Sequence, residues 1–135
     1  MTKQAPSLVL ESHPKNIAEV EPFVNQVLQE YDMNQDIFGN ILITLTEAVS
    51  NAILHGNRAR THKKVFVSTR CSAQTISFVV KDEGTGFDPD ILPDPTAPEN
   101  ICTPGGRGVF LMRQLCDTVA FSEGGSVVEL GFNRF

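Results

Sequence analysis

The chain has 135 residues and a mass of 14.8 kDa, the usual size of one globular domain, so we expect a single domain over residues 1–135. Hydrophobic residues make up 41% and charged residues 20%, which argues against a disordered or collagen-like chain. The formal net charge of −5 argues against broad attraction to nucleic-acid phosphates. Protein or small-molecule partners are therefore expected, and no direct nucleic-acid partner.

Membrane and secretory features are not evident in the sequence. No apolar run approaches the ~20 residues of a membrane span, and the start, MTKQAPS, lacks the basic and apolar regions of a signal peptide. We therefore expect no membrane association and a cytoplasmic location. The three cysteines, Cys71, Cys102 and Cys116, are too few and too scattered for a disulfide framework or a zinc site, so they are interpreted as structural or incidental.

The first third of the chain predicts one strand and two helices. Residues 7–11 (SLVLE) alternate weakly, as in a strand, and apolar residues then recur at helical spacing from Ile17 to Tyr31. Pro22 means that this helix begins near Glu21 or bends in its first turns. A stronger helix is expected from an N-cap at Asp36 to Gly56, with a broad apolar face made of Phe38, Ile41, Leu42, Leu45, Ala48, Val49, Ala52 and Ile53.

The rest of the chain predicts two hairpins separated by a loop and a helix. β-Branched and aromatic runs at 65–71 and 75–81 indicate the first hairpin, and 118–122 with 127–132 the second. Between them, a proline-rich stretch of about twenty residues (88–106) has the length of a lid or binding loop, and a helix of about three turns follows from Val109. This order predicts an α+β fold, a two-layer sandwich with helices on one face of a mixed, mostly antiparallel sheet.

The second predicted helix carries polar residues that packing does not require. At 100° per residue, Asn40, Thr44, Glu47, Asn51 and His55 fall within an arc of about 80° beside the apolar face. Glu47 and Asn51 are one turn apart, and a carboxylate next to a carboxamide could act as a base beside a magnesium ion held mainly through water and phosphates. The stripe is equally compatible with a solvated polar face.

Two glycine-rich segments follow strands or precede helices. In DEGTG, Asp82 comes directly after a predicted strand and could accept a hydrogen bond from an exocyclic amine such as that of adenine, with Gly84 and Gly86 permitting close ligand approach. The segment could also be only the turn that ends a hairpin. In GGRG (105–108), free amides at a helix start could bind a phosphate.

Together these segments resemble a known family. EAVSNAILHGN (47–57), DEGTGFDP (82–89) and GGRGVFLM (105–112) resemble the N box and the two glycine boxes of the ATP-binding domains shared by DNA gyrase, Hsp90, histidine kinases and MutL, the GHKL or Bergerat fold. Within that group the chain is most similar to the small anti-sigma-factor serine kinases. The matches extend over most of the chain, and the first motif is highly specific.

The resemblance implies a role for each matching residue. Asn51 would hold Mg²⁺ against the ATP phosphates, and Glu47 would act as the base or position the nucleophile beside the γ-phosphate. Asp82 would accept the adenine amino group, with Gly84 and Gly86 shaping the pocket. The remaining implied nucleotide contacts are the phosphate-flanking Gly106 and Gly108, Arg107 between them, and Ser126 near adenine on a late strand, with an ATP lid at about 88–106.

The resemblance further implies an ATP- and Mg²⁺-dependent serine/threonine protein kinase that phosphorylates an anti-sigma-factor antagonist and binds a sigma factor. Related kinases are often dimers, so a homodimer remains open. Histidine autophosphorylation, at His55 or elsewhere, is not expected, because the phosphorylated histidine of histidine kinases lies in a separate helical domain for which this chain has no room. Neither His13 nor His62 lies in a convincing phosphoacceptor context. Two alternatives are a non-catalytic ATP-sensing module and an ATPase or histidine-kinase-like domain of a larger assembly.

Overall fold

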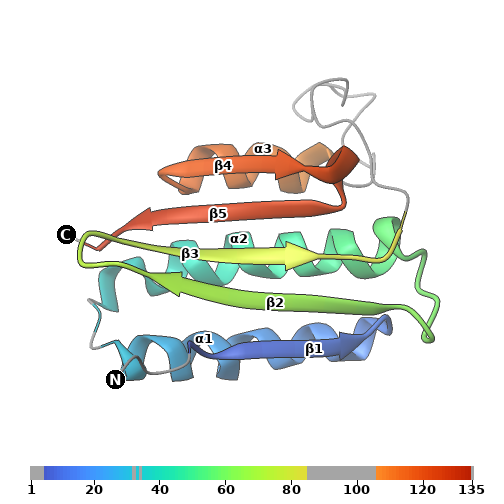
Figure 1. The fold of residues 1–135 in the computed structure, drawn as a ribbon, viewed down its shortest axis with the longest axis horizontal. Coiled ribbons are helices and arrows are strands. Elements are labelled where there is room, and N and C mark those ends of the chain that lie inside the picture. The colour runs from blue at the N-terminus through green and yellow to red at the C-terminus, as the bar shows by residue number, and fades with distance from the viewer. Residues whose placement is uncertain (1–4, 32, 34, 85–105, 135) are drawn as a thin grey trace.

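The computed structural model describes residues 5–31, 33, 35–84 and 106–134. Five strands and three α-helices follow one another along these segments (Figure 1). The strands are β1 (Ser7–Glu11), β2 (Lys64–Cys71), β3 (Thr75–Lys81), β4 (Thr118–Ser122) and β5 (Val127–Asn133). The α-helices are α1 (Val20–Glu30), α2 (Phe38–Asn51) and α3 (Gly106–Leu115).

The strands form one sheet in the order β1-β2-β3-β5-β4. All four strand pairs are antiparallel, so the described sheet has no parallel pair of the kind that a mixed sheet would contain. β3 lies at its centre, with Val80 opposite Val67 on β2 and Val128 on β5. The expected strands and both hairpins are present, and the second hairpin turns at Glu123–Gly125, where all three residues have a left-handed φ.

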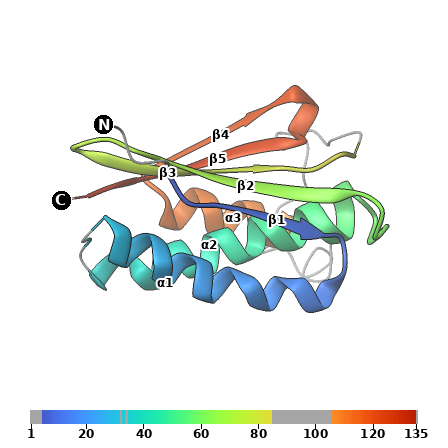
Figure 2. The same ribbon diagram turned by 60° about the horizontal axis from the view of Figure 1, so that its bottom comes forward.

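All three helices cover the same face of the sheet, as Figure 2 shows. Alternate strand residues point toward the helices and are buried, because successive side chains of a strand face opposite sides. Phe78, at the middle of β3, is fully buried and makes edge-to-face contacts with Phe23 of α1 and Phe132 of β5, at centroid distances of 6.5 and 6.2 Å. The expected two-layer α+β fold is confirmed.

The starts and ends of the helices differ in detail from the expectation. Pro22 lies in the first turn of α1, where a missing N–H costs nothing. The N-cap prediction at Asp36 is wrong: Asp36 belongs to a short 3₁₀ turn (Gln35–Ile37), and Ile37 caps α2 without a side-chain bond. The helix ends at Gly56 as expected, but through a π-helical turn, Ala52–Gly56.

The long central helix has the length and hydropathy of a membrane span. The stretch Gln35–Gly56 has 22 residues and passes such a test by composition alone, so the expectation that no segment approaches a span was too strong. In the structure this helix packs against the sheet, with Ile41, Leu45, Val49 and Ile53 fully buried. The core accounts for these four residues, whereas Ile43 and Leu54 of the same stretch are exposed.

The two described cysteines are half-buried and free. Burial, with a smaller contribution from the carboxylate of Asp117, raises the pKa of the Cys116 thiol to about 11 against the opposing hydrogen bond with Thr44. That thiol is therefore protonated and unreactive at neutral pH, in keeping with a structural role. Cys102 lies outside the described residues.

Candidate functional site

The end of α2 meets the start of α3 at a glycine. Glu47 and Asn51 lie one turn apart on α2, and Gly108 lies in the first turn of α3. A Cβ on Gly108 would lie only 2.9 Å from Oε2 of Glu47 and 3.1 Å from Nδ2 of Asn51. The missing side chain therefore lets the N-terminal backbone of α3 approach both polar groups, and places the positive end of a helix dipole beside them.

Asn51 has an unused hydrogen-bonding group in this junction. Its Nδ2 atom is buried and has no hydrogen-bond partner among the described residues. Buried polar side-chain atoms in proteins are nearly always bonded, and an unbonded one costs about 1–3 kcal/mol. An unsatisfied amide at a helix–helix junction is thus a candidate ligand-binding group.

Asp82 follows the last residue of β3 and is 6% exposed. Its backbone N–H donates to the carbonyl oxygen of Ser126 (2.9 Å), and its Oδ1 accepts the N–H of Gly84 (2.8 Å). Burial raises the pKa of the Asp82 carboxyl, while the Gly84 bond and the charge of Lys63 act in the opposite direction. The site thus holds a buried carboxylate whose second oxygen, Oδ2, accepts no hydrogen bond from the described residues.

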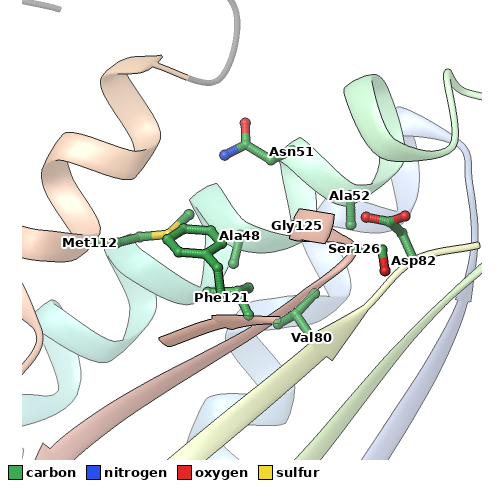
Figure 3. A pocket seen from close by; sticks show the side chains of 10 residues that line it. Ala48, Asn51, Ala52, Val80, Asp82, Met112, Phe121, Gly125 and Ser126 are labelled. Carbon is green, nitrogen blue, oxygen red and sulfur yellow. The ribbon is translucent and has the colours of Figure 1, made fainter. Parts of the chain in front are cut away.

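A cavity connects Asp82 with Asn51 between the helices and the sheet (Figure 3). Its volume is about 20 Å³, and about 270 Å³ when the open space at its mouth is included. Its walls are mostly apolar, and the carboxylate of Asp82 and the side chain of Ser126 lie side by side at one end. The lining residues are Ala48, Asn51, Ala52, Val80, Asp82, Met112, Phe121, Gly125, Ser126 and Val128.

This lining suits a flat heteroaromatic group with an amino substituent. Apolar walls can enclose the faces of such a ring, and a carboxylate can accept from its amine. The hydroxyl of Ser126 donates to the carbonyl oxygen of Glu123 (2.9 Å), which leaves its oxygen available as an acceptor. Asn51 lies at the rim of the cavity, between Asp82 on one side and Met112 with Phe121 on the other (Figure 3), and its Nδ2 atom lies near Gly108 of α3.

Gly56 and Asn57 also shape the Asp82 end, and the sequence predicted no role in the site for either. A side chain on Gly56 would collide with the Asp82 carboxylate, and one on Gly84 with the carbonyl oxygen of Gly56. Asn57, 1% exposed, bonds Ser12 Oγ (2.8 Å) and the Lys64 carbonyl (3.0 Å) through Nδ2 and accepts the N–H of Glu83 (2.8 Å). The sequence signal that could have identified Asn57 was its position directly after Gly56, the glycine that ends the helix.

The structure brings together Glu47, Asn51 and Gly108 at one end of the site and Asp82, Gly84 and Ser126 at the other. Gly106 and Arg107 belong to the first turn of α3. Gly86 and residues 88–105 of the expected lid lie outside the described residues. The roles assigned to all these residues remain predictions.

The polar stripe of α2 is not a uniformly solvated face. Thr44 is fully buried, and its hydroxyl donates to the carbonyl oxygen of Asn40 (2.7 Å). His55 is exposed at the end of the helix, and Asn40 is exposed near its start. Only Glu47 and Asn51 of this stripe therefore lie at the junction with Gly108.

A model of the histidine kinase-like ATPase domain matches residues 10–132. The chain belongs to this family. The match includes every strand and helix described above except the first residues of β1 and the last of β5. The expected resemblance to GHKL domains of the anti-sigma kinase type is thereby confirmed at the level of the fold.

Known proteins similar to the chain include two anti-sigma F factors. The one from Oceanobacillus iheyensis is 29% identical over 85 residues, 63% of this chain and 58% of the relative. The one from Bacillus subtilis is 29% identical over 101 residues, 72% of this chain and 68% of the relative. The first match thus spans less than two thirds of the relative's length.

A solved structure has a similar fold. It contains the RsbU and RsbW domains of Rv1364c from Mycobacterium tuberculosis. The TM-score is 0.64 with 16% sequence identity, and the match covers 94% of this chain and 32% of that one. At this identity the likeness concerns the fold alone.

Proposed function

We propose that this family member is a cytoplasmic ATP- and Mg²⁺-dependent serine protein kinase and anti-sigma regulatory factor. It would phosphorylate an anti-sigma-factor antagonist and bind a sigma factor. The observation that carries the proposal is the junction of Glu47, Asn51 and Gly108 at the rim of a cavity that the buried Asp82 also lines. The similarity to two proteins named anti-sigma F factor supports the regulatory part.

At the base end, the Asp82 carboxylate would accept a hydrogen bond from the amino group of adenine. One of its oxygens already accepts from Gly84, which fixes the orientation of the group. The second oxygen is then the acceptor for the base. Ser126 would add an acceptor beside it, and Gly86 would shape the pocket together with Gly84, whose missing side chain is needed against Gly56.

At the phosphate end, the backbone amides of Gly106, Arg107 and Gly108 would face the phosphates, since the first N–H groups of a helix lack internal partners. The donor set fits magnesium held mainly by phosphates and water, because the Asn51 amide supplies a hard oxygen and no cluster of three acidic or histidine ligands exists among the described residues. The ion would neutralise charge on the phosphates.

Glu47 would act on the attacking hydroxyl. A serine Oγ of the antagonist would form a bond to the γ-phosphorus while the bond to the β–γ bridging oxygen breaks, and ADP would leave with that electron pair. The Glu47 carboxylate would take the proton of the serine. Glu47 is half-buried, so it combines a position beside Gly108 with access from solvent.

Labelling with γ-³²P-ATP tests the proposed function. The purified chain, Mg²⁺ and small proteins from the source organism are incubated together, and labelled proteins undergo phosphoamino-acid analysis. The proposal predicts phosphoserine on one small protein. ATP binding without any labelled protein would favour the nucleotide-sensing module, and phosphate release without a partner would favour the ATPase. A homodimer would appear in the mass distribution of the same preparation.

Nucleotide affinity should fall as the pH is lowered and the Asp82 carboxylate takes up a proton. Only the ionised carboxylate offers a charged acceptor to adenine through the oxygen that does not accept from Gly84. Burial raises the pKa of this carboxyl above its ordinary value of 3.8, so protonation and loss of affinity begin at a higher pH than for an exposed aspartate. Calorimetric titration with ADP measures this, with Asp82→Asn as the control that lacks the titrating group. Equal pH profiles would contradict the assignment.

A Gly108→Ala variant should lose transfer activity without losing stability. Alanine favours a helix over glycine by up to about 1 kcal/mol. Its Cβ would, however, displace Glu47 and Asn51, because it would lie 2.9 and 3.1 Å from their side-chain atoms. Misplacement of such groups by about 1 Å can lower a rate on the order of 10- to 100-fold. Thermal unfolding and the labelling rate measure the two effects, and unchanged transfer would contradict the close junction.

A further inference from the structure

The loop that connects the π-helical turn with β2 lies near the sheet end where β3 finishes (Figure 1). Residues of this loop line a second cavity. Its volume is about 140 Å³, against the roughly 10–15 Å³ that a cavity needs in order to hold one water molecule. It is lined by Gly56, Asn57, Arg58, Arg60, Lys63 and Gly84. None of these residues lines the cavity between Asp82 and Asn51.

Three of the six lining residues are cationic. The chain is acidic overall, yet four of its eleven lysines and arginines lie between positions 58 and 64. In the part of the chain that the structure describes, Arg58, Arg60 and Lys63 form no ion pair within 4.0 Å. A cation near the C-terminus of a helix is stabilised by the helix dipole. That effect explains one cation after Gly56, but it does not explain three cations around one cavity.

The backbone that carries these cations is held in place. The N–H of Arg60 donates to the carbonyl oxygen of Asn57 (3.1 Å), and the N–H of Lys63 to that of Arg60 (2.9 Å). The buried Asn57 holds the loop in place by donating a hydrogen bond to Ser12 Oγ and accepting one from the N–H of Glu83. Arg58 and Ala59 have φ values of 53° and 54°, a left-handed conformation that is uncommon outside glycine and clusters at ligand-binding positions.

We propose that this pocket binds a phosphate group. Two guanidinium groups and an ammonium around one small cavity suit a single centre with several acceptor oxygens, because arginine bonds such oxygens in pairs. Glu83 accepts the N–H of Lys64 (3.4 Å) beside the cavity, and the Asp82 carboxylate is close enough for the charge of Lys63 to lower its pKa; these two carboxylates reduce the local charge from +3 to about +1. A phosphate monoester carries about −1.5 to −2 at pH 7, which is opposite in sign to that charge.

Amide NMR of the full chain saturated with Mg²⁺ and ADP tests the proposal, since the nucleotide then occupies the other site. Inorganic phosphate is added at constant ionic strength, and O-phosphoserine in a second series. We expect saturable shifts at residues 56–64, 83 and 84 at millimolar phosphate. The compound with the lower dissociation constant, inorganic phosphate or O-phosphoserine, indicates whether the pocket accepts the free ion or a phosphorylated side chain.

The Arg58→Gln/Arg60→Gln variant should weaken phosphate binding by at least about tenfold. Arg70→Gln is the matched control, because Arg70 is exposed on the sheet near Glu129 and away from the loop. Lys63→Gln gives an independent variant with an unaltered left-handed turn. Unsaturable shifts, shifts confined to α3, or equal affinity in the double variant and the wild type would overturn the proposal.

Discussion

Replacing Glu47 with alanine is expected to lower the rate of phosphoryl transfer by at least about 100-fold while leaving the ATP dissociation constant within about threefold. The carboxylate lies beside Gly108 at the phosphate end of the site, and it does not line the cavity proposed for the base. It would therefore contribute to proton removal from serine and little to nucleotide affinity.

Two further variants separate the charge of Glu47 from its size. Glu47→Gln keeps the shape but cannot take up the proton, so its transfer rate should fall as in Glu47→Ala. Glu83→Gln removes an exposed carboxylate outside the junction and should transfer normally. Single-turnover labelling and calorimetric ATP titration measure rate and affinity separately. Wild-type transfer by Glu47→Ala would show that Glu47 is not the base.

Replacing Asp82 with asparagine should have opposite effects on nucleotide affinity and on stability. Loss of a charged acceptor for the adenine amine corresponds to about 1.5–3 kcal/mol, or an affinity about 10- to 150-fold weaker. The asparagine can still accept the N–H of Gly84, so the turn that follows β3 is preserved.

The stability effect follows from the raised pKa of Asp82. The folded, ligand-free chain binds this proton more tightly than the unfolded chain, so the group's favourable contribution is present below pH 3.8 and is lost as the pH rises through the folded pKa. As the pH rises, the wild type therefore loses a stabilising contribution that Asp82→Asn, which has no titrating group at this position, does not lose. The variant should melt at a higher temperature than the wild type at pH 7, with the difference shrinking at acidic pH.

Thermal unfolding between pH 5 and 8 and calorimetric ADP titration measure the two effects of Asp82→Asn. A stabilised variant with weakened ADP binding would identify Asp82 as a residue kept for function at the expense of stability. Unchanged ADP affinity would mean that the base binds elsewhere, and a lower melting temperature at pH 7 would contradict the burial argument.

The fold followed largely from local patterns. The β-branched and aromatic runs at 65–71 and 75–81 predicted β2 and β3 to within a residue, because such side chains pack well on a pleated, half-buried surface. The apolar face of α2 was equally clear. The start of α2 was missed because Asp36 looks like an N-cap in isolation, whereas the chain enters the helix through a 3₁₀ turn.

The combination of motifs predicted which residues belong to the candidate site. It did not predict all of the contacts between them. The spacing of Glu47 and Asn51 on a helix was predictable, since four residues make one turn. Their contact with Gly108 depends on how α3 packs on α2, which no local pattern encodes. Asn57 was missed because its three partners, Ser12, Lys64 and Glu83, come from segments up to 45 residues away.

The central claim is that one nucleotide spans the cavity from Asp82 to the junction of Glu47, Asn51 and Gly108. A crystal structure of the chain with Mg²⁺ and the non-hydrolysable analogue AMP-PCP tests this most directly. We predict the adenine amino group within hydrogen-bonding distance of the Asp82 carboxylate, Mg²⁺ bound by the Asn51 amide oxygen, and the phosphates at the amides of residues 106–108. A nucleotide bound elsewhere, or bound with its base away from Asp82, would contradict the claim.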